Sequence, residues 1–180
     1  MSTAVSLHLS DPPRIVLMGV SGCGKSSVGA ALSALTGVPY QDADDLHPSA
    51  NVEKMRAGIA LTDDDRWPWL TTCAEALAGS AGGLILGCSA LKRIYRDHLR
   101  GAAGRDLAFV HLIGTREVIL ERMRARVNHY MPVSLLDSQF ATLEPPGEDE
   151  NAMAVSIDVP PAQIAAQIRS AYAWQGLQAS

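Results

Sequence analysis

The amino-acid sequence predicts an α/β fold in which five parallel β-strands form a sheet with helices on both faces. Two observations lead to this prediction. Five short apolar runs of strand length alternate along the chain with longer segments of helical character, which is typical of a parallel sheet. A glycine-rich segment also joins the first apolar run to the first helical segment, as a tight strand-to-helix connection requires.

The first strand and the first helix flank this glycine-rich segment. Residues 14–18 form a short apolar run typical of a buried strand. Residues 27–35 are rich in alanine, leucine and serine and favour a helix. Residues 38–41 then predict a short second strand. Residues 1–13 end in two prolines, and we expect them to form a flexible N-terminal tail.

Two helices are expected between the second and third strands. Residues 48–57 begin with a proline, which suits the first turn of a helix, and Gly58 ends the pattern. Residues 65–78 follow an acidic stretch, and acidic side chains favour a helix start. The segment of about 42–80 is therefore predicted to be a mainly helical insertion.

The later elements alternate regularly. The run at 84–88 is continuously apolar, as in a parallel strand buried on both faces. Further strands are expected at 107–113 and 153–157, and helices at 91–100, 116–126, 134–143 and 162–174. Residues 128–132 break the pattern, so we expect a lid at about 122–134. Residues 14–174 then form a single domain, followed by a C-terminal tail at 175–180.

Composition limits the classes of function. Hydrophobic residues make up 47% of the 180 residues and charged residues 19%, which suits one globular domain with a sizeable core. A net charge of −4 without a polybasic stretch argues against nucleic acid or a membrane surface as the partner. Three cysteines without metal-ligand spacing favour a reducing compartment, so we expect a cytoplasmic protein.

The glycine-rich segment matches the phosphate-binding P-loop pattern G-x-x-x-x-G-K-[ST] between Gly19 and Ser26. Its glycines let the backbone approach a phosphate, and the following helix N-terminus attracts the negative charge. Lys25 is expected to reach the β- and γ-phosphates, and Ser26 to ligate Mg²⁺. A glycine turn with a solvated lysine is the alternative, which the strand-and-helix context disfavours. The predicted ATP phosphate-binding residues are Gly19, Ser21, Gly22, Cys23, Gly24, Lys25, Ser26 and Ser27.

Two carboxylates follow the second predicted strand. In extended backbone Asp42 and Asp44 would point the same way. Phosphoryl transfer needs a carboxylate that accepts or orients the proton of the acceptor hydroxyl, and often another near the metal. We therefore expect Asp44 to act on the acceptor and Asp42 to lie in the outer shell of Mg²⁺. The alternative is a solvated turn.

Cationic side chains follow the third strand and the acidic stretch. Lys92 and Arg96 are four residues apart and would share one helix face, which suits a carboxylate or the transferred phosphate. For Arg96 an exposed basic helix face is about as plausible. Arg66 could anchor an acidic substrate or pair with a neighbouring aspartate, whereas Asp63 and Asp64 are interpreted as ordinary helix-start residues.

Arginines also precede the expected lid. Arg126 is expected to neutralise charge at the transition state when the lid closes. The sequence leaves open which of Arg122, Arg124 and Arg126 contacts phosphate, and a helix end with favourable basic residues is the alternative. His129 lies in the lid and could contact the substrate.

Taken together, these segments resemble the gluconokinase family over about residues 15–171. The P-loop is shared with many families, and the other matching segments are more specific. They are Asp42-Ala43-Asp44-Asp45-Leu46-His47-Pro48, Asn51-Val52-Glu53-Lys54-Met55, Leu61-Thr62-Asp63-Asp64-Asp65-Arg66, Cys88-Ser89-Ala90-Leu91-Lys92-Arg93, Ser138-Gln139-Phe140 and Leu143-Glu144-Pro145-Pro146-Gly147.

The resemblance implies a three-layer P-loop NTPase fold similar to nucleoside-monophosphate kinases, with a helical substrate-binding insertion and a lid. It implies phosphorylation of D-gluconate at the 6-hydroxyl by ATP with Mg²⁺, commonly in a homodimer. Substrate contacts are then expected from Asp44, His47, Arg66, Lys92, Arg96 and His129. By the same resemblance, Asp158 and Arg122 are expected near adenine, and Lys25, Asp44 and Arg126 would be catalytic.

Two other functions remain open from sequence alone. A related kinase could act on shikimate or a nucleoside monophosphate, although shikimate kinases are expected to show a glycine triplet where this chain has Gly87-Cys88-Ser89-Ala90. The chain could also be an ATP-binding switch or adaptor without turnover. The GTPase strings Asn-Lys-x-Asp and Asp-x-x-Gly do not occur, and the retention of Lys25, Ser26 and Asp44 argues against a non-catalytic adaptor.

Overall fold

The computed structural model describes residues 7–126 and 132–174. Within them a single sheet of five parallel strands has the order β2-β3-β1-β4-β5, which confirms the predicted fold class. The strands are β1 (Arg14–Met18), β2 (Tyr40–Asp42), β3 (Leu84–Gly87), β4 (Ala108–Ile113) and β5 (Ala152–Ser156).

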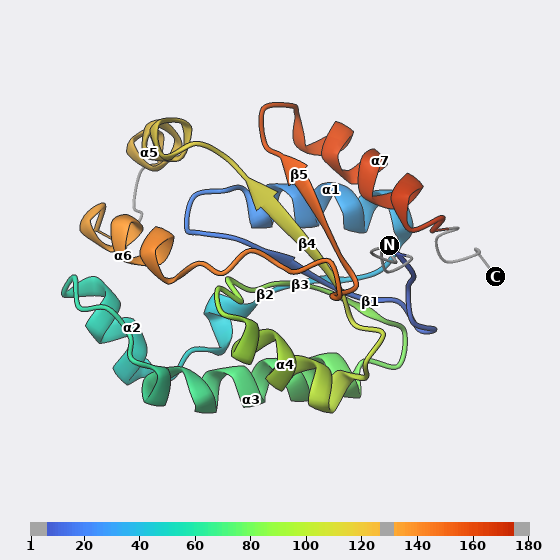
Figure 1. Ribbon diagram of the computed structural model, residues 1–180, viewed down its shortest axis with the longest axis horizontal. Helices are drawn as coiled ribbons and strands as arrows, with labels where there is room; N and C mark the ends of the chain where they lie inside the picture. The colour runs from blue at the N-terminus through green and yellow to red at the C-terminus, as the bar shows by residue number, and fades with distance from the viewer. Residues whose placement is uncertain (1–6, 127–131, 175–180) are drawn as a thin grey trace.

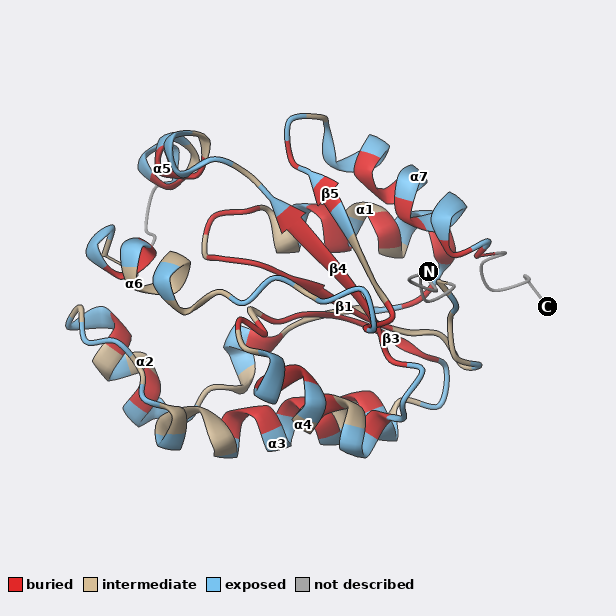
Figure 2. Cartoon of the chain, viewed as in Figure 1, coloured by how far each residue is buried: buried red, intermediate tan, exposed pale blue. Residues whose placement is uncertain are grey.

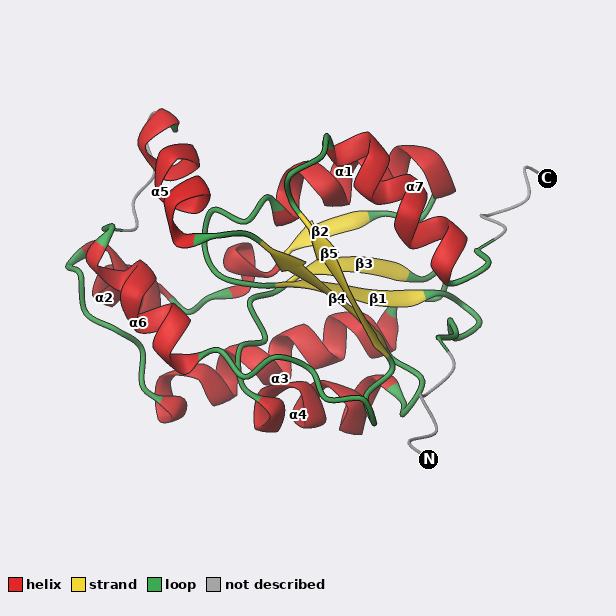
Figure 3. Ribbon diagram, turned by 45° about the horizontal axis from the view of Figure 1, so that its top comes forward, coloured by secondary structure: helices red, strands yellow, loops and turns green. Residues whose placement is uncertain are grey.

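Helices cover both faces of the sheet (Figures 1 and 3). On one face lie α1 (Lys25–Thr36) and α7 (Pro161–Ala171), and on the other lie α3 (Asp63–Gly79) and α4 (Arg93–Ala103). A third group gathers toward the end of the sheet where the strands finish. It consists of the 3₁₀ helix η1 (Ala43–Leu46), α2 (Ser49–Arg56), α5 (Arg116–Ala125) and α6 (Ser134–Thr142).

The alternation of side chains along β1 divides the core into two parts. Ile15 and Leu17 pack with residues of α1 and α7 on one face, whereas Val16 and Met18 pack with residues of α3 and α4 on the other. Successive strand side chains point to opposite faces, and all four are fully buried. Figure 2 shows the same division, since the helices on both faces turn buried surfaces toward the buried strands.

Some element boundaries differ from the sequence prediction for local reasons. The capping box of Thr62 and Asp65 starts α3 at Asp63 rather than at residue 65. Lys92 has extended backbone angles and caps α4, which therefore begins at Arg93. The 3₁₀ helix after β2 was not predicted; the side chain of Asp42 caps it by accepting the Asp44 N–H.

The described part of the predicted N-terminal tail contacts the domain. The side chains of Leu7 and Leu9 pack against the core. The His8 N–H donates to Asn151 Oδ1, and Asn151 Nδ2 donates to the His8 carbonyl. Residues 7–9 are thereby held beside the start of β5. Among the described helices, none has the length and apolar character that crossing a membrane requires.

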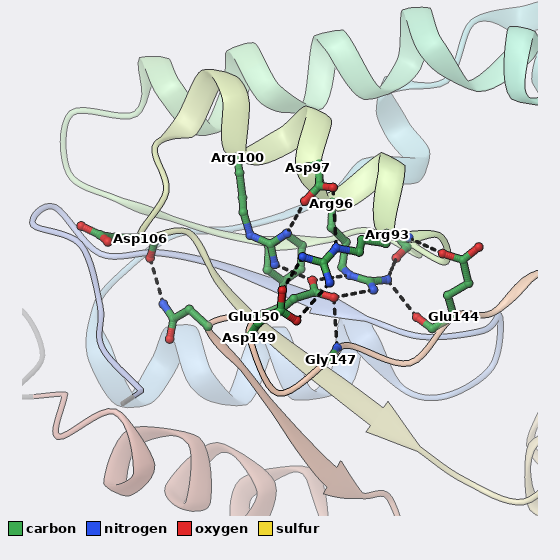
Figure 4. Close-up of polar contacts among 12 residues, drawn as sticks. Arg93, Arg96, Asp97, Arg100, Asp106, Glu144, Gly147, Asp149 and Glu150 are labelled. Atoms are coloured by element: carbon green, nitrogen blue, oxygen red, sulfur yellow. Dashed lines mark hydrogen bonds and ion pairs between the residues drawn. The ribbon is translucent and has the colours of Figure 1, made fainter. Parts of the chain in front are cut away.

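A buried ion cluster joins α4 to the loop before β5 (Figure 4). The side chains of Arg96 and Glu150 are almost completely buried and form two hydrogen bonds of 2.8 Å. Arg96 Nη1 also donates to the carbonyls of Ala90 and Glu144, each at 3.0 Å. Arg100 Nη2 adds a third bond to Glu150, at 2.6 Å. The guanidinium of Arg96 thus connects three separate segments of the chain.

Removal of the Glu150 charge is expected to destabilise the fold strongly. Glu150→Gln leaves the buried charge of Arg96 without its counter-ion, so we expect a loss of about 3 kcal/mol in the free energy of unfolding. Urea denaturation at pH 7 measures it. Asp149→Asn is the matched control, because the exposed ion pair of Asp149 with Arg93 should contribute less than about 1 kcal/mol. Equal effects of the two substitutions would contradict this account.

The Glu150 contribution should also depend on pH. Burial raises the pKa of Glu150, but the hydrogen bonds from Arg96 and Arg100 outweigh burial and lower it to about 2. A carboxyl whose pKa is lower in the folded state stabilises the fold above its unfolded pKa. This stabilisation should be lost as the pH falls from about 4.3, the ordinary glutamate value, toward 2.

Candidate active site

Residues of the P-loop segment line two cavities. The first opens at the carboxyl ends of the strands, between the P-loop and the helices α2, α3 and α6. Its lining is Ser21, Lys25, Asp44, His47, Met55, Ala60, Leu61, Arg66, Trp69, Ser89, Leu91, Leu135, Ser138 and Gln139. The second is lined by Gly22, Cys23, Gly24, Ser27, Val28, Arg122, Ala125, Arg126, Val159, Pro161 and Ile164. The loop between β1 and α1 therefore contributes to both.

The backbone of the P-loop needs its glycines. Gly22 and Gly24 have φ angles of +79° and +96°, a region that side chains with a Cβ rarely adopt. A Cβ on Gly22 would also lie 2.8 Å from Cγ of Met123. This geometry turns the loop into the N-terminus of α1, where backbone N–H groups are available for an anion.

The ammonium group of Lys25 is held by the loop itself. Lys25 Nζ donates to the carbonyls of Gly19 and Val20, both at 3.1 Å, and lies 3.8 Å from Sγ of Cys23. The lysine also lines the first cavity. Its charge therefore lies where the P-loop meets that cavity.

Helix α6 reaches the P-loop through Gln139. The Ser21 N–H donates to Gln139 Oε1 at 2.6 Å, and both residues line the first cavity beside Ser138. Sequence reasoning gave Gln139 no role. The only signal for it was its place in one of the segments that resemble gluconokinases.

The two aspartates after β2 take different positions. The predicted extended arrangement is wrong, because the chain turns into η1 directly after Asp42. Asp42 Oδ1 accepts the Asp44 N–H at 2.9 Å, whereas the exposed carboxylate of Asp44 lines the first cavity. Burial raises the pKa of Asp42, although the Asp44 N–H and the Lys25 ammonium act in the opposite direction. Asp42 therefore lies within electrostatic reach of Lys25.

His47 forms one wall of the first cavity. Its ring stacks on Trp69 with centroids 4.1 Å apart and an interplanar angle of 14°. Trp69 is itself fixed by a 2.7 Å hydrogen bond from Nε1 to the Ala43 carbonyl. Burial, with a smaller contribution from the Arg66 charge, lowers the pKa of His47 to about 4. The ring is consequently neutral near pH 7.

Arg66 brings positive charge into the first cavity. Its Nη1 donates to the hydroxyl of Tyr95 at 3.1 Å, and that hydroxyl donates to Asp63. Asp63 Oδ1 also accepts from Lys92 Nζ at 3.0 Å. Asp63 thus organises the cations instead of only starting α3, and the hydrogen bonds from Tyr95 and Lys92 lower its pKa. Lys92 itself does not line the cavity.

The prediction that Arg96 binds substrate is wrong. Its side chain is fully buried, and its donors are directed at Glu150 and at the carbonyls of Ala90, Leu91 and Glu144. The predicted common face of Lys92 and Arg96 is absent because α4 begins only at Arg93. Arg96 instead supports the loop that carries Ser89 and Leu91 into the cavity.

The second cavity brings together most of the residues expected on the nucleotide side. Arg122 Nη2 donates to the Ile157 carbonyl at 2.7 Å, and both Arg122 and Arg126 line the cavity. Asp158 does not line it, although Val159 and Pro161 do. The Asp158 carboxylate accepts from the hydroxyl of Ser156 at 2.8 Å. His129 lies outside the described residues, as does the part of the predicted lid at 127–131.

Similarity to known proteins shows the family to which this chain belongs. No protein-family model matches the chain. It is, however, 47% identical over 148 residues to a gluconokinase of Gluconobacter oxydans (strain 621H), and the alignment covers 81% of this chain and 83% of the relative. This chain belongs to the gluconokinase family.

A solved gluconokinase has the same fold over most of the chain. The crystal structure of a gluconokinase from Sinorhizobium meliloti 1021 matches with a TM-score of 0.82 and 49% identity, covering 90% of this chain and 92% of that one. The resemblance to gluconokinases found in the sequence is thereby confirmed. Shikimate kinase from Aquifex aeolicus matches with a TM-score of 0.57 and 20% identity, covering 86% and 92% of the two chains. That likeness concerns the fold alone.

Proposed function

We propose that this protein is a gluconokinase that transfers the γ-phosphoryl group of ATP to the 6-hydroxyl of D-gluconate. One observation carries the proposal beyond family membership. Lys25 of the P-loop, Asp44 and Arg66 all line the first cavity. They supply a phosphate ligand, a proton acceptor and a ligand for the carboxylate of a sugar acid.

The nucleotide is proposed to occupy the P-loop with its base toward the second cavity. The N–H groups at the start of α1 and the Lys25 ammonium would bind the phosphates, as in other P-loop proteins. Arg122 and Arg126 line this cavity and would offset phosphate charge from the side of α5. The family resemblance alone leads us to propose Asp158 near the base, since its carboxylate accepts from Ser156 and it does not line this cavity.

The acceptor is proposed to lie in the first cavity, with its carboxylate near the positive charge of Arg66 and its 6-hydroxyl near the negative charge of Asp44. Arg66 would bind the carboxylate, while Lys92 supports Arg66 indirectly through Asp63. Asp44 would orient the 6-hydroxyl and accept its proton as the new P–O bond forms. The 6-hydroxyl oxygen of the sugar acid would then face the phosphate bound by Lys25. Positioning of this kind lowers the activation free energy of the phosphoryl transfer.

The side-chain oxygen atoms near the P-loop are of the type that Mg²⁺ prefers as ligands. Ser26 has an exposed residue position in the first turn of α1, and Asp42 lies near Lys25. No group of three or more metal-ligating side chains occurs among residues 7–126 and 132–174, so phosphate and water oxygens would complete the shell, as is usual for this ion. We propose Ser26 as a direct ligand and Asp42 in the outer shell. When bound, Mg²⁺ would neutralise phosphate charge.

Two further proposals concern the oligomeric state and the location of the protein. The family resemblance alone leads us to propose a homodimer, which the molar mass in solution by light scattering would test.

The three cysteines, Cys23, Cys73 and Cys88, are buried and free, which agrees with a reducing compartment. We propose a cytoplasmic location on that ground.

A panel of acceptors tests the proposed reaction. ADP release from ATP and Mg²⁺ should depend on D-gluconate and be negligible with shikimate, nucleoside monophosphates or no acceptor. The Lys25→Ala variant supplies the background, because it lacks the ammonium that contacts the phosphates. Turnover with another acceptor in preference to gluconate would contradict the proposed substrate, and no acceptor-dependent turnover would contradict the proposed reaction.

Substitution of Asp44 tests the proton acceptor. Asp44→Asn should lower kcat by about 100-fold or more, because an amide cannot take the proton of the hydroxyl. Asp45→Asn is the matched control, since Asp45 is adjacent and exposed and does not line the cavity. Steady-state kinetics with saturating gluconate and ATP measure the effect. Near-normal turnover of Asp44→Asn would remove Asp44 from the proposed mechanism.

Substitution of Arg66 tests the carboxylate site. Arg66→Ala should raise the KM for gluconate by about 10- to 100-fold, the effect of losing one charge-assisted hydrogen bond, and leave the KM for ATP unchanged. Lys92→Ala should act in the same direction but less, because its ammonium pairs with Asp63 outside the cavity. Arg105→Ala, an exposed arginine ahead of β4, serves as the control. A larger effect on ATP than on gluconate would move Arg66 to the nucleotide side.

A further inference from the structure

The ring of His47 is buried and held by two neighbours. It stacks on Trp69, its side chain is only 4% exposed, and Nδ1 lies 3.3 Å from Nδ2 of Asn51. Its other nitrogen, Nε2, lies 3.9 Å from Oδ1 of Asp44, and both residues line the first cavity. The two ring nitrogens therefore have different neighbours, and these neighbours determine where the proton resides.

Asn51 fixes the role of Nδ1. Asn51 is buried, and its Nδ2 donates to the backbone carbonyl of Asp65 at 2.8 Å. A carbonyl can only accept, so the amide cannot be reversed without placing its own oxygen against that of Asp65. The amide nitrogen carries a second hydrogen, which is directed at Nδ1 of His47. Nδ1 must then be the unprotonated, accepting nitrogen.

The proton of the neutral ring consequently lies on Nε2. The charged groups near the ring are Asp44 on η1 and Arg66 on α3, while the carboxylate of Asp65 is bound to Lys54. Burial and Arg66 both lower the pKa of His47, so the ring does not gain a second proton near neutral pH. The Nε2–H is thus a permanent donor in the cavity under these conditions.

We propose that Asn51 holds His47 in the Nε2–H tautomer and that His47 and Asp44 together recognise one hydroxyl group of the acceptor. The 3.9 Å between Nε2 and Oδ1 is too long for a direct hydrogen bond. A hydroxyl oxygen about 2.8 Å from each atom fits between them. It would accept from His47 and donate to Asp44. This step rests on the proposed function, in which Asp44 acts on the 6-hydroxyl.

The pair selects for an alcohol. A hydroxyl can donate one hydrogen bond and accept another at once, which an ammonium group cannot do because it has no acceptor. With its proton on Asp44 and one lone pair on His47, the oxygen keeps its second lone pair for the phosphorus atom. His47 is thus a substrate-binding residue, and Asn51 is a positioning residue that acts through it.

The tautomer can be measured without any turnover. Nitrogen-15 NMR of protein labelled at histidine distinguishes protonated from unprotonated ring nitrogens, and the spectrum of His47→Phe identifies the His47 signals among those of the five histidines. Between pH 6 and 8 we expect a protonated Nε2 and an unprotonated Nδ1, without titration. A protonated Nδ1, or titration near pH 6.5, would overturn the proposal. Asn51→Leu should yield a mixture of His47 tautomers. An unchanged tautomer in this variant would show that Asn51 does not fix the tautomer.

Kinetics test the recognition of the hydroxyl. His47→Phe keeps an aromatic ring against Trp69 but has no donor, so kcat/KM for gluconate should fall by about 10-fold with the KM for ATP unchanged. His47→Gln restores an N–H and should recover part of the loss. His98→Phe on α4, outside the cavity, is the control. Normal kcat/KM for gluconate in His47→Phe would overturn the recognition step.

The two proposals fail separately. Absence of gluconate-dependent turnover in the wild-type protein would refute the proposed function, while the tautomer of His47 could still be read. Normal gluconate kinetics in His47→Phe would leave the gluconokinase proposal intact and refute only the role of His47.

Discussion

The buried guanidinium of Arg96 is the contact on which the arrangement of the first cavity depends. It joins α4 to the carbonyls of Ala90 and Leu91, to Glu144 after α6, and to Glu150 before β5. Ala90 has a φ of +44°, a conformation that costs free energy for a residue with a Cβ and persists only where the surroundings hold it. The same guanidinium therefore keeps Leu91 at the cavity and anchors the segment that follows Gln139.

The site also depends on the parallel arrangement of the strands. Because all five run in the same direction, their carboxyl ends and the loops that follow them lie at one edge of the sheet. The P-loop follows β1, Asp44 follows β2 and Ser89 follows β3. Arg66 and Gln139 come from helices that close this edge. The residues proposed to bind the phosphate and the acceptor are thus brought to one edge of the sheet by its topology.

Sequence alone predicts those parts of the site that local spacing determines. The P-loop is a contiguous pattern, and Asp44 is singled out because it follows a strand, although the turn into η1 that positions it was not predicted. The roles of Asp63 and Arg96 could not be predicted in this way. Asp63 meets Lys92 across 29 residues of sequence, and the partner of Arg96 lies 54 residues away. A periodic pattern identifies the residues on one helix face, but it does not reveal which element packs against that face. The predicted start of α4 was also two residues too early, so Lys92 was wrongly placed on a helix face.

The hydrogen bonds of Lys25 have a consequence for the entropy of nucleotide binding. A long lysine side chain that is free in water loses rotamer freedom when a ligand fixes it, at a cost of about 0.5–1.5 kcal/mol. Here the carbonyls of Gly19 and Val20 already restrict the side chain of Lys25. Much of this ordering therefore takes place when the chain folds. In the proposed complex, a phosphate would replace these neutral acceptors by anionic ones around an ammonium that is already in place.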